Sequence, residues 1–450
     1  MSTSVMTEET VKPQSNLGPL SIIAALFFIF GFITWQNGAL VPYLQMVCQL
    51  TETEALMVAS AFYLAFTLVA LPSAAILEKT GYKNGIVYGL LTIVVGFLLY
   101  IPAAKLQAFW LFIIAQFVIG SALTLLQTAA NPYVVKVGPI ESASVRIMFM
   151  GLMNKGAGVI VPVLFTAVVL GGFSDVTTTS LAAMSEAERQ QTIDGMANGL
   201  VNPYIGMAVL FVFLAFLMKK VNLPELDLDN DSEGEDATHD ASGKDKTSIM
   251  QFPHLILGAV TIWGYVGVEV IAGDTIGLFG SNLGVPNATS LTSYTMGFML
   301  VGYALGIALI PRLISQEFAL KASAVTGIIF SLLVVYGDNS SYVMSEILWG
   351  WTGIPTLPDT ITCIALLGFS NAVVWPAVWP LALEGLGRFT SKGSALLIMG
   401  ISGGAVLPLV YGLLSESIDG QSAYWMMVPI YIFILFYAVK GHKIKSWGNS

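Results

Sequence analysis

The amino-acid sequence predicts an all-α membrane protein with twelve transmembrane helices in two six-helix halves. Of its 450 residues, 55% are hydrophobic and only 10% are charged, and the mean hydropathy is +0.77. A chain of this composition cannot be solvated as a water-soluble globule, so lipid is expected to be its solvent. Apolar stretches long enough to span a bilayer recur along the chain, and one long polar segment divides them into two equal sets.

The predicted spans fill the chain between residues 20 and 440. In order, they cover 20–47, 55–77, 84–103, 108–134, 145–170, 202–220, 254–280, 289–311, 321–336, 360–383, 393–414 and 423–440. The first is too long for a secretory signal peptide and follows the acidic opening MSTSVMTEET, so we expect it to stay in the mature protein. The expected domains are a tail at 1–19, a bundle at 20–220, a linker at 221–250, a bundle at 251–440 and a tail at 441–450.

Basic residues predict the orientation of these spans. Those in even-numbered loops or in the C-terminal tail are Lys79, Lys83, Lys136, Arg146, Lys219, Lys220, Arg312, Lys321, Arg388, Lys392, Lys440, Lys443 and Lys445. Only Lys105 and Arg189 fall on the other side. By the positive-inside rule, both termini are expected to be cytoplasmic.

The linker carries the excess negative charge behind the net charge of −9. Its stretch LPELDLDNDSEGEDATHDASGKDK is polar and without periodicity, so it is expected to be disordered. The two cysteines and three histidines form no disulfide or ligand pattern, so neither a cofactor nor a metal site is expected. The expected partners are the bilayer and a small molecule, not a nucleic acid.

The two halves contain a weak internal repeat. LPSAAILEK of span two matches IPRLISQE of span eight, with Pro and Glu both in register. GAGVIVPVLF of span five matches GGAVLPLVYG of span eleven, with the spacing from Gly to Pro preserved. Six spans, a cytoplasmic linker and six similar spans of the same orientation form a parallel repeat.

The loop after span two, AAILEKTGYK, carries the candidate gating residues. It keeps Glu78, Lys79, Gly81 and Lys83 of the Gly-x-x-x-Asp-Arg-x-Gly-Arg-Lys motif of the major facilitator superfamily, with Ala74 in place of the first Gly. An acid, a base and a turn-forming Gly beside a helix end suit a charge latch that breaks when two halves rock. With the twelve spans, this loop resembles that of major facilitator transporters.

Polar side chains mark one face of several spans. In span four they are Gln116, Gly120, Thr124, Gln127 and Asn131, at steps of three or four. Span one adds Thr34 and Asn37, span five Asn154, and span ten Asn371 and Trp375. Amides and hydroxyls around indoles suit a neutral polyhydroxylated ligand, which predicts a sugar pathway. The alternative is that the amides hold helices together.

Three ionisable residues, Lys155, Glu269 and Asp274, lie within apolar spans. Each costs about 3 kcal/mol or more if unpaired in the membrane. Asp274 is rotated about 140° from Glu269 on an ideal helix, so the two acids cannot form a pair on one face. Our hypothesis is that Lys155 pairs with Glu269 across the interface between the halves, as a lock or coupling element, or approaches it through the bound sugar. The alternative is two snorkelling charges without a transport role.

Several segments resemble one family of sugar transporters. FFIFGFITWQNGALVPYL, LTLLQTAANPYVVKVGP, SVRIMFMGLMNKGAG, YVGVEV and WPLALEGLG are similar to segments of the fucose permease and the bacterial glucose/galactose and N-acetylglucosamine permeases, the fucose-galactose-glucose:cation symporters. The resemblance implies a major facilitator fold, residence in the bacterial inner membrane, and secondary active uptake of a hexose or hexose derivative. The candidate substrate-binding residues are Asn37, Gln127, Asn131, Asn154, Glu269, Asn371 and Trp375.

The chain departs from this family at positions that concern coupling. The family's Asn-Asp pair falls on Asn37 and Gly38, so the acid associated with cation coupling is missing. Gln127 stands where the fucose permease has Glu, and Lys155 replaces a small residue. Glu269 matches an acid of the glucose/galactose branch. Sodium, proton or no coupling stay open, with a cation coupled through Glu269 as our expectation and with Lys155 and Asp274 as further coupling candidates.

Three other functions compete with cation-coupled uptake. If Lys155 stands in for the cation, the protein is an uncoupled sugar facilitator. A drug or metabolite exporter of the same fold would have an apolar, aromatic cavity, and a sugar sensor would bind without flux. An enzyme is not expected, because no nucleophile and base occur together and Asp274 has no second intramembrane aspartate with which to share a proton. Proteins of this fold usually act as monomers, so a monomer is expected.

Overall fold

The computed structural model describes residues 17–136, 143–221, 246–310 and 312–447. Within these ranges the chain is helical and has no strand. The N-terminal half consists of α1 (Leu17–Val47), α2 (Glu52–Thr80), α3 (Tyr82–Lys105), α4 (Phe109–Lys136), α5 (Ala143–Phe165), the π-helix η2 (Thr166–Leu170), η3 (Gly171–Phe173), α6 (Thr178–Ala183) and α7 (Glu186–Lys220). The C-terminal half consists of η5 (Ile249–Gln251), α8 (Pro253–Asn282), η6 (Ala288–Ser290), α9 (Thr292–Leu309), α10 (Gln316–Tyr336), α11 (Val343–Trp349), η7 (Gly350–Thr352), α12 (Asp359–Asn371), α13 (Val374–Leu383), η8 (Gly387–Phe389), α14 (Thr390–Met399), η9 (Gly400–Ser402), α15 (Gly403–Ser417), η10 (Ser422–Met426), α16 (Met427–Val439) and η11 (Gly441–Lys443).

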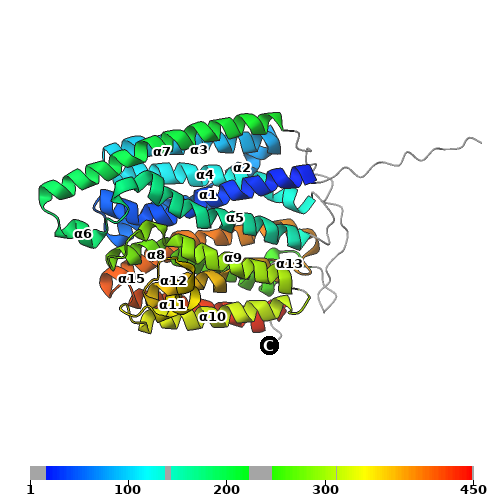
Figure 1. The fold of residues 1–450 in the computed structure, drawn as a ribbon. Helices are drawn as coiled ribbons and strands as arrows, with labels where there is room; N and C mark the ends of the chain where they lie inside the picture. Colours follow the sequence, from blue (N-terminus) through cyan, green and yellow to red (C-terminus); the bar gives the residue numbers. More distant parts are fainter. Residues whose placement is uncertain (1–16, 137–142, 222–245, 311, 448–450) are drawn as a thin grey trace, which may run out of the picture.

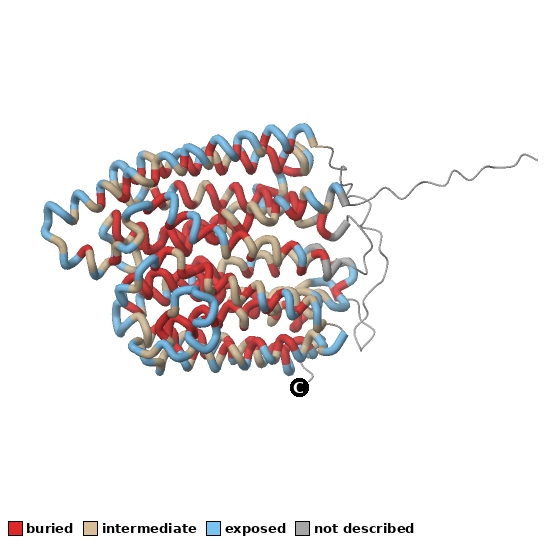
Figure 2. Tube along the Cα trace, in the orientation of Figure 1, coloured by how far each residue is buried: buried red, intermediate tan, exposed pale blue. Residues whose placement is uncertain are grey.

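The described helices include twelve segments that are long and apolar enough to cross a bilayer, which confirms the predicted number. Most of the linker and most of the N-terminal tail lie outside the described residues. Buried residues line the contacts between helices, and exposed residues follow the outer faces (Figure 2). Large apolar side chains such as Leu71 and Val209 are among the exposed ones, as expected where a helix meets lipid.

Several predicted spans differ from the observed helices: span five continues from α5 into the π-helix η2, span eleven consists of α14, η9 and α15, and spans six and ten differ as follows. α7 begins at Glu186 instead of 202, because a capping box of Ser185 and Glu188 starts a polar helical extension. The tenth span, predicted as one helix over 360–383, is divided into α12 and α13. Pro376 accounts for the division, since its ring disfavours helical hydrogen bonding to the carbonyl four residues earlier.

The two halves lie side by side along parallel helices (Figure 1). Across their interface α5 packs on α9, α2 on α15 and α1 on α8. In the second half, α8, α9 and α15 correspond to α1, α2 and α5 of the first half. The contact of α5 with α9 therefore corresponds to that of α15 with α2, and the contact of α1 with α8 corresponds to itself. The parallel repeat inferred from the sequence has this symmetry.

The halves are joined at one end of the bundle, which we call the Glu52 end, where α2 begins at Glu52 and α8 ends at Asn282. The bonds between the halves there include Ser415 Oγ to Glu52, Asn282 Nδ2 to Glu52 (2.5 Å), Thr53 N to Glu416 (2.8 Å), Thr178 N to Ser281 Oγ (3.2 Å) and Asn287 N to Ser174 O (3.2 Å). At the opposite end, the Lys220 end, where α7 ends at Lys220, no hydrogen bond or ion pair between described residues joins the halves. The conformation is therefore closed at the Glu52 end.

Candidate functional site

The centre of the interface holds an ion pair between Lys155 of α5 and Glu269 of α8. Lys155 Nζ lies 2.5 Å from Glu269 Oε1, and each side chain is 9% exposed. Lys155 belongs to the N-terminal half and Glu269 to the C-terminal half, so the pairing hypothesis from the sequence is confirmed as a contact. Because opposite charges neutralise each other there, neither is buried alone.

Trp35 of α1 organises the N-terminal side of this pair. Lys155 Nζ lies 4.1 Å from the centroid of its ring, in cation–π geometry. Trp35 Nε1 donates a hydrogen bond to Asn154 Oδ1 at 3.0 Å. Gly158 and Gly273 flank the indole so closely that a Cβ on either would lie 2.8 Å from it. The indole is thus held between α5 and α8, and it positions the amide and the ammonium together.

Aromatic side chains from the C-terminal half surround the same region. Tyr265 lies one helical turn before Glu269, and its ring centroid is 6.5 Å from that of Trp375. Trp375 stacks on Trp379 at 5.2 Å and 26°. Tyr303 of α9 packs in one buried cluster with Trp35. Indole and phenol faces beside amides can pack against the C–H side of a sugar ring while the amides bond its hydroxyls.

The predicted residues on α4 lie on the inner face of that helix. Gln127 and Asn131 are half-buried. Gln127 shares a helix face with Gln116, which bonds Asn37 of α1, and with Gly120, where a Cβ would overlap Phe62 O of α2. Gln127 therefore faces α1 and α2 rather than lipid. No hydrogen bond between described residues links it to Asn154 or Glu269.

Asn37 and Asn371 lie apart from this cluster, each inside its own half. Asn37 Oδ1 accepts a hydrogen bond from Gln116 beside a cavity of about 10 Å³ lined from α1, α3, α4 and α7. Asn371 is 0% exposed and accepts a hydrogen bond from Tyr431 Oη at 2.8 Å. In this conformation both amides join helices of one half, which is the alternative that the sequence left open.

Asp274 of α8 does not pair with Glu269. It is 0% exposed, and both carboxylate oxygens are without a hydrogen-bond partner among the described residues. The backbone beside it is engaged, since Thr292 Oγ1 donates to Gly273 O at 2.7 Å and Thr295 Oγ1 to Ala272 O at 3.1 Å. Asp274 is therefore a buried acid separate from the central ion pair.

The gating candidates lie at the Lys220 end. Glu78, Lys79 and Gly81 are exposed and Lys83 is half-buried. Gly81 has φ of 77°, a conformation that favours glycine, and its N–H closes α2 by donating to Leu77 O. None of these side chains forms an ion pair with another described residue. A latch among them is therefore not closed in the described part of the chain.

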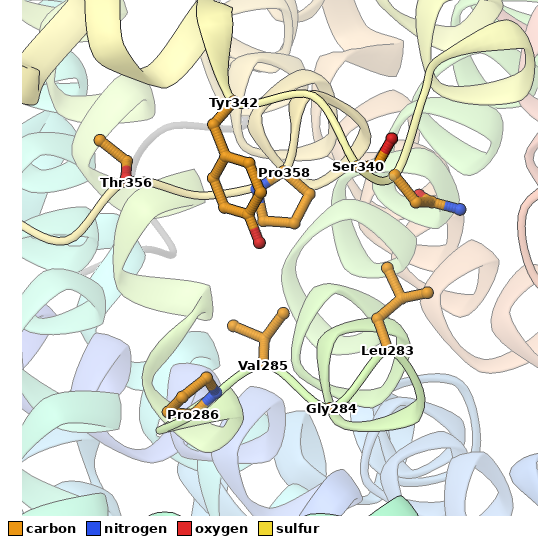
Figure 3. Close-up of a pocket in the computed structure, with 9 residues that line it drawn as sticks. Leu283, Gly284, Val285, Pro286, Ser340, Tyr342, Thr356 and Pro358 are labelled. Atoms are coloured by element: carbon orange, nitrogen blue, oxygen red, sulfur yellow. The ribbon is translucent and has the colours of Figure 1, made fainter.

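A larger cavity of about 360 Å³ lies at the Glu52 end, within the C-terminal half. Its walls come from the segment that follows α8 and from the segments flanking α11. Tyr342 projects into it from one side and Val285 from the other (Figure 3). It begins 14 residues after Glu269, roughly 20 Å along a helix, so it is separate from the ion pair.

Sequence reasoning missed Trp35 and Tyr303, because one more aromatic residue in an apolar span is ordinary composition. Only the tertiary packing of α1, α5 and α9 places these two side chains beside a buried charge. Among the described residues, no group of three or more His, Cys, Asp or Glu side chains could hold a metal ion.

Comparison with known proteins places the chain among sugar transporters, although no family model matches it. The glucose/galactose transporter of Brucella abortus is 32% identical over 98% of this chain and 100% of that protein. The L-fucose-proton symporter of Escherichia coli is 25% identical over 97% of this chain and 96% of its own. The structure of the E. coli fucose:proton symporter superposes with a TM-score of 0.65 at 21% identity, covering 94% of this chain and 98% of that one. The inward open E. coli xylose transporter superposes with a TM-score of 0.66 at 12% identity, covering 97% and 98%.

Proposed function

Because this chain belongs to the sugar transporters of the major facilitator superfamily that include the B. abortus glucose/galactose transporter, we propose that it imports a hexose or hexose derivative by alternating access, together with a cation. Glucose, galactose, N-acetylglucosamine and fucose are the candidate sugars. The relatives named for glucose/galactose and for L-fucose with a proton support glucose, galactose and fucose, and N-acetylglucosamine is retained from the sequence resemblance.

One observation carries the proposal: Trp35, Asn154, Lys155 and Glu269 meet at the interface between the halves. A ligand bound there touches both halves, so its binding changes as they rock. The cluster also offers an indole face, an amide and charged hydrogen-bonding groups, which together suit a neutral sugar. We assign substrate binding to this cluster with Gln127, Asn131 and Trp375.

The orientation follows from the distribution of basic residues. In a bacterial inner membrane, with both termini cytoplasmic, the Lys220 end faces the cytoplasm and the Glu52 end faces outward. The conformation described here is then closed to the outside. Glu78, Lys79, Gly81 and Lys83 become a cytoplasmic latch that forms when the Lys220 end closes, and the protein works as a monomer.

Uptake of labelled sugars into vesicles tests the proposal. The four candidate sugars are offered separately, with a sodium gradient, with a proton gradient and with neither, and vesicles without the protein are the control. Accumulation above the outside concentration with one gradient supports symport. Equilibration of the sugar that does not depend on either gradient indicates an uncoupled facilitator. The ion pair between Lys155 and Glu269 favours this second function, because the ammonium occupies the place of a coupling cation. Failure to transport any hexose, with or without gradients, would overturn the proposal.

A further inference from the structure

Asp274 occupies a place where a charged carboxylate has no compensation. The residue is 0% exposed, and neither carboxylate oxygen has a hydrogen-bond partner among the described residues. The polar groups nearby are hydrogen-bonded to one another and not to Asp274. Thr292 Oγ1 donates to Gly273 O at 2.7 Å, and Thr275 Oγ1 lies 2.7 Å from Tyr424 Oη. An ionised carboxylate there would be desolvated and unpaired, which is unfavourable, whereas the neutral acid is tolerated.

The position of Asp274 is set by the packing of α8 at the junction of the halves. Gly277, on the turn after it, faces α1, and Gly267, two turns before it, faces Leu407 of α15. Helical arithmetic directs Asp274 between these two helices, where α2 packs on α15. Tyr63 of α2 lies within electrostatic range of it. Asp274 therefore borders the surfaces that separate when the Glu52 end opens.

The surrounding elements supply no cation for this carboxyl group. The described part of α1 contains no charged residue. The packed elements carry one titratable group on α1 and others on α2, α8, α9, α15 and η10: Tyr43, Glu52, Glu54, Tyr63, Glu78, Lys79, His254, Tyr265, Glu269, Tyr294, Tyr303, Tyr411, Glu416 and Tyr424. Lys79 lies at the Lys220 end, and His254 lies 20 residues before Asp274, roughly 30 Å along α8, so neither reaches the carboxyl group. Lys155 of α5 is held by Glu269 at 2.5 Å. Closing the halves around Asp274 thus favours the protonated acid.

We propose that Asp274 is the proton-binding group of the transport cycle. A proton from the outer medium adds to the Asp274 carboxylate while the Glu52 end is open, and closure then buries the neutral acid. The proton leaves toward the cytoplasm before the Glu52 end reopens, which regenerates the carboxylate. The Lys155–Glu269 pair stays charged and carries no proton. This inference rests on the proposed function and makes the co-transported cation a proton, bound by Asp274 instead of Glu269.

The test measures how pH controls opening of the Glu52 end. In a chain with Cys48→Ser and Cys363→Ala, Leu56→Cys is the reporter, because Leu56 is 0% exposed and packs at Gly412 across the interface. A membrane-impermeant maleimide labels it only when that end opens. Ser417→Cys, an exposed position near the same end, corrects for the pH dependence of the thiol reaction.

With Asp274 present, corrected labelling of the reporter should rise with pH, by up to about tenfold per pH unit for one coupled proton. In Asp274→Asn, which mimics the neutral acid, the reporter cysteine should be labelled slowly at every pH. Asp274→Ser is a second neutral variant, for use if the amide disturbs folding, and should give the same slow labelling. The double variant Lys155→Met/Glu269→Leu, which removes both charges of the central pair, should keep the pH dependence. Labelling independent of pH in the parent, or an unchanged profile in both Asp274 variants, would overturn the inference. The assay needs no sugar, so its failure leaves the proposed sugar uptake standing, and failure of uptake leaves this result intact.

Discussion

The ammonium of Lys155 lies 4.1 Å from the ring centroid of Trp35 and 2.5 Å from Glu269 Oε1. One cation is therefore shared between the π-face of an indole from one half and a carboxylate from the other. The carboxylate neutralises the charge, and the indole replaces part of the hydration that the ammonium lost. This arrangement makes the interface polar at its centre without leaving net charge in the membrane.

Removing one partner of this pair should destabilise the protein more than removing both. Lys155→Met or Glu269→Gln alone leaves one charge buried, at a cost of about 3–5 kcal/mol. The double variant Lys155→Met/Glu269→Leu should recover most of that loss in Tm, measured by thermal unfolding in detergent. Lys321→Met, which removes a surface pair at 4.0 Å, is the control and should shift Tm little. A double variant at least as unstable as the worse single variant would contradict this.

Replacing Asn154 should weaken sugar binding, whereas replacing Asn37 should not. Asn154→Ala removes an amide of the proposed site, and a sugar hydroxyl left unpaired in the complex costs about 1–3 kcal/mol, or roughly 5- to 150-fold in affinity. It also removes the acceptor that holds Trp35 Nε1. Gln127→Ala should also lower affinity. Asn37→Ala should leave affinity unchanged and lower Tm, because Asn37 bonds Gln116 of α4 and lies apart from the central cluster. Calorimetric titration with the transported sugar measures the affinity of the three variants. Unchanged affinity in both Asn154→Ala and Gln127→Ala would contradict the assigned site.

A side chain at Gly38 should prevent the Glu52 end from closing. A Cβ there would overlap Thr292 Oγ1 and lie 2.8 Å from Gly273 O, so α1 and α8 could not approach as they do. Gly38→Ala should increase maleimide labelling of the Leu56→Cys reporter and reduce the uptake rate. Gly156→Ala, at a position where a Cβ meets nothing within 4 Å, is the matched control. Equal labelling in the two variants would show that close packing at Gly38 does not control closure.

The carboxylate of Glu52 should stabilise the closed end. It accepts hydrogen bonds from Ser415 and from Asn282 in the other half, and bonds to a charged group are worth about 1.5–3 kcal/mol each. Glu52→Ala should therefore raise labelling of the Leu56→Cys reporter by at least about tenfold. Ser417→Ala, whose hydroxyl bonds its own helix at Leu414 O, should change nothing. Labelling that stays at the parent level in Glu52→Ala would remove Glu52 from the closing contacts.

The sequence predicts those features of this fold that depend on apolar length. The number of spans follows from hydropathy alone, because each must cross the same thickness of lipid. The first turns of α7 were missed because Glu186 and the residues after it are polar, although the capping box at Ser185 marks the true start. The division between α12 and α13 depends on how the chain near Pro376 repacks, which a hydropathy window does not see.

The candidate site was predictable only in part, because a polar stripe identifies a helix face but not what that face meets. Lys155 and Glu269 stood out, since each is too costly in lipid to lack a partner. Asn37 and Asn154 have the same amide chemistry on neighbouring helices, yet Asn37 bonds Gln116 away from the ion pair, whereas Asn154 bonds Trp35, which contacts Lys155. That difference arises from tertiary packing, which residue type and spacing do not encode.

The ion pair at the centre also limits how this protein can be recombined. A chimera that took its first six helices from a relative with uncharged residues at both positions of the pair would leave Glu269 buried without a counter-charge. The reciprocal chimera, with the last six helices of the relative, would leave the Lys155 ammonium buried without a counter-charge. The two halves must therefore be inherited as a matched set, and a swap with such a relative should succeed only when both positions travel together.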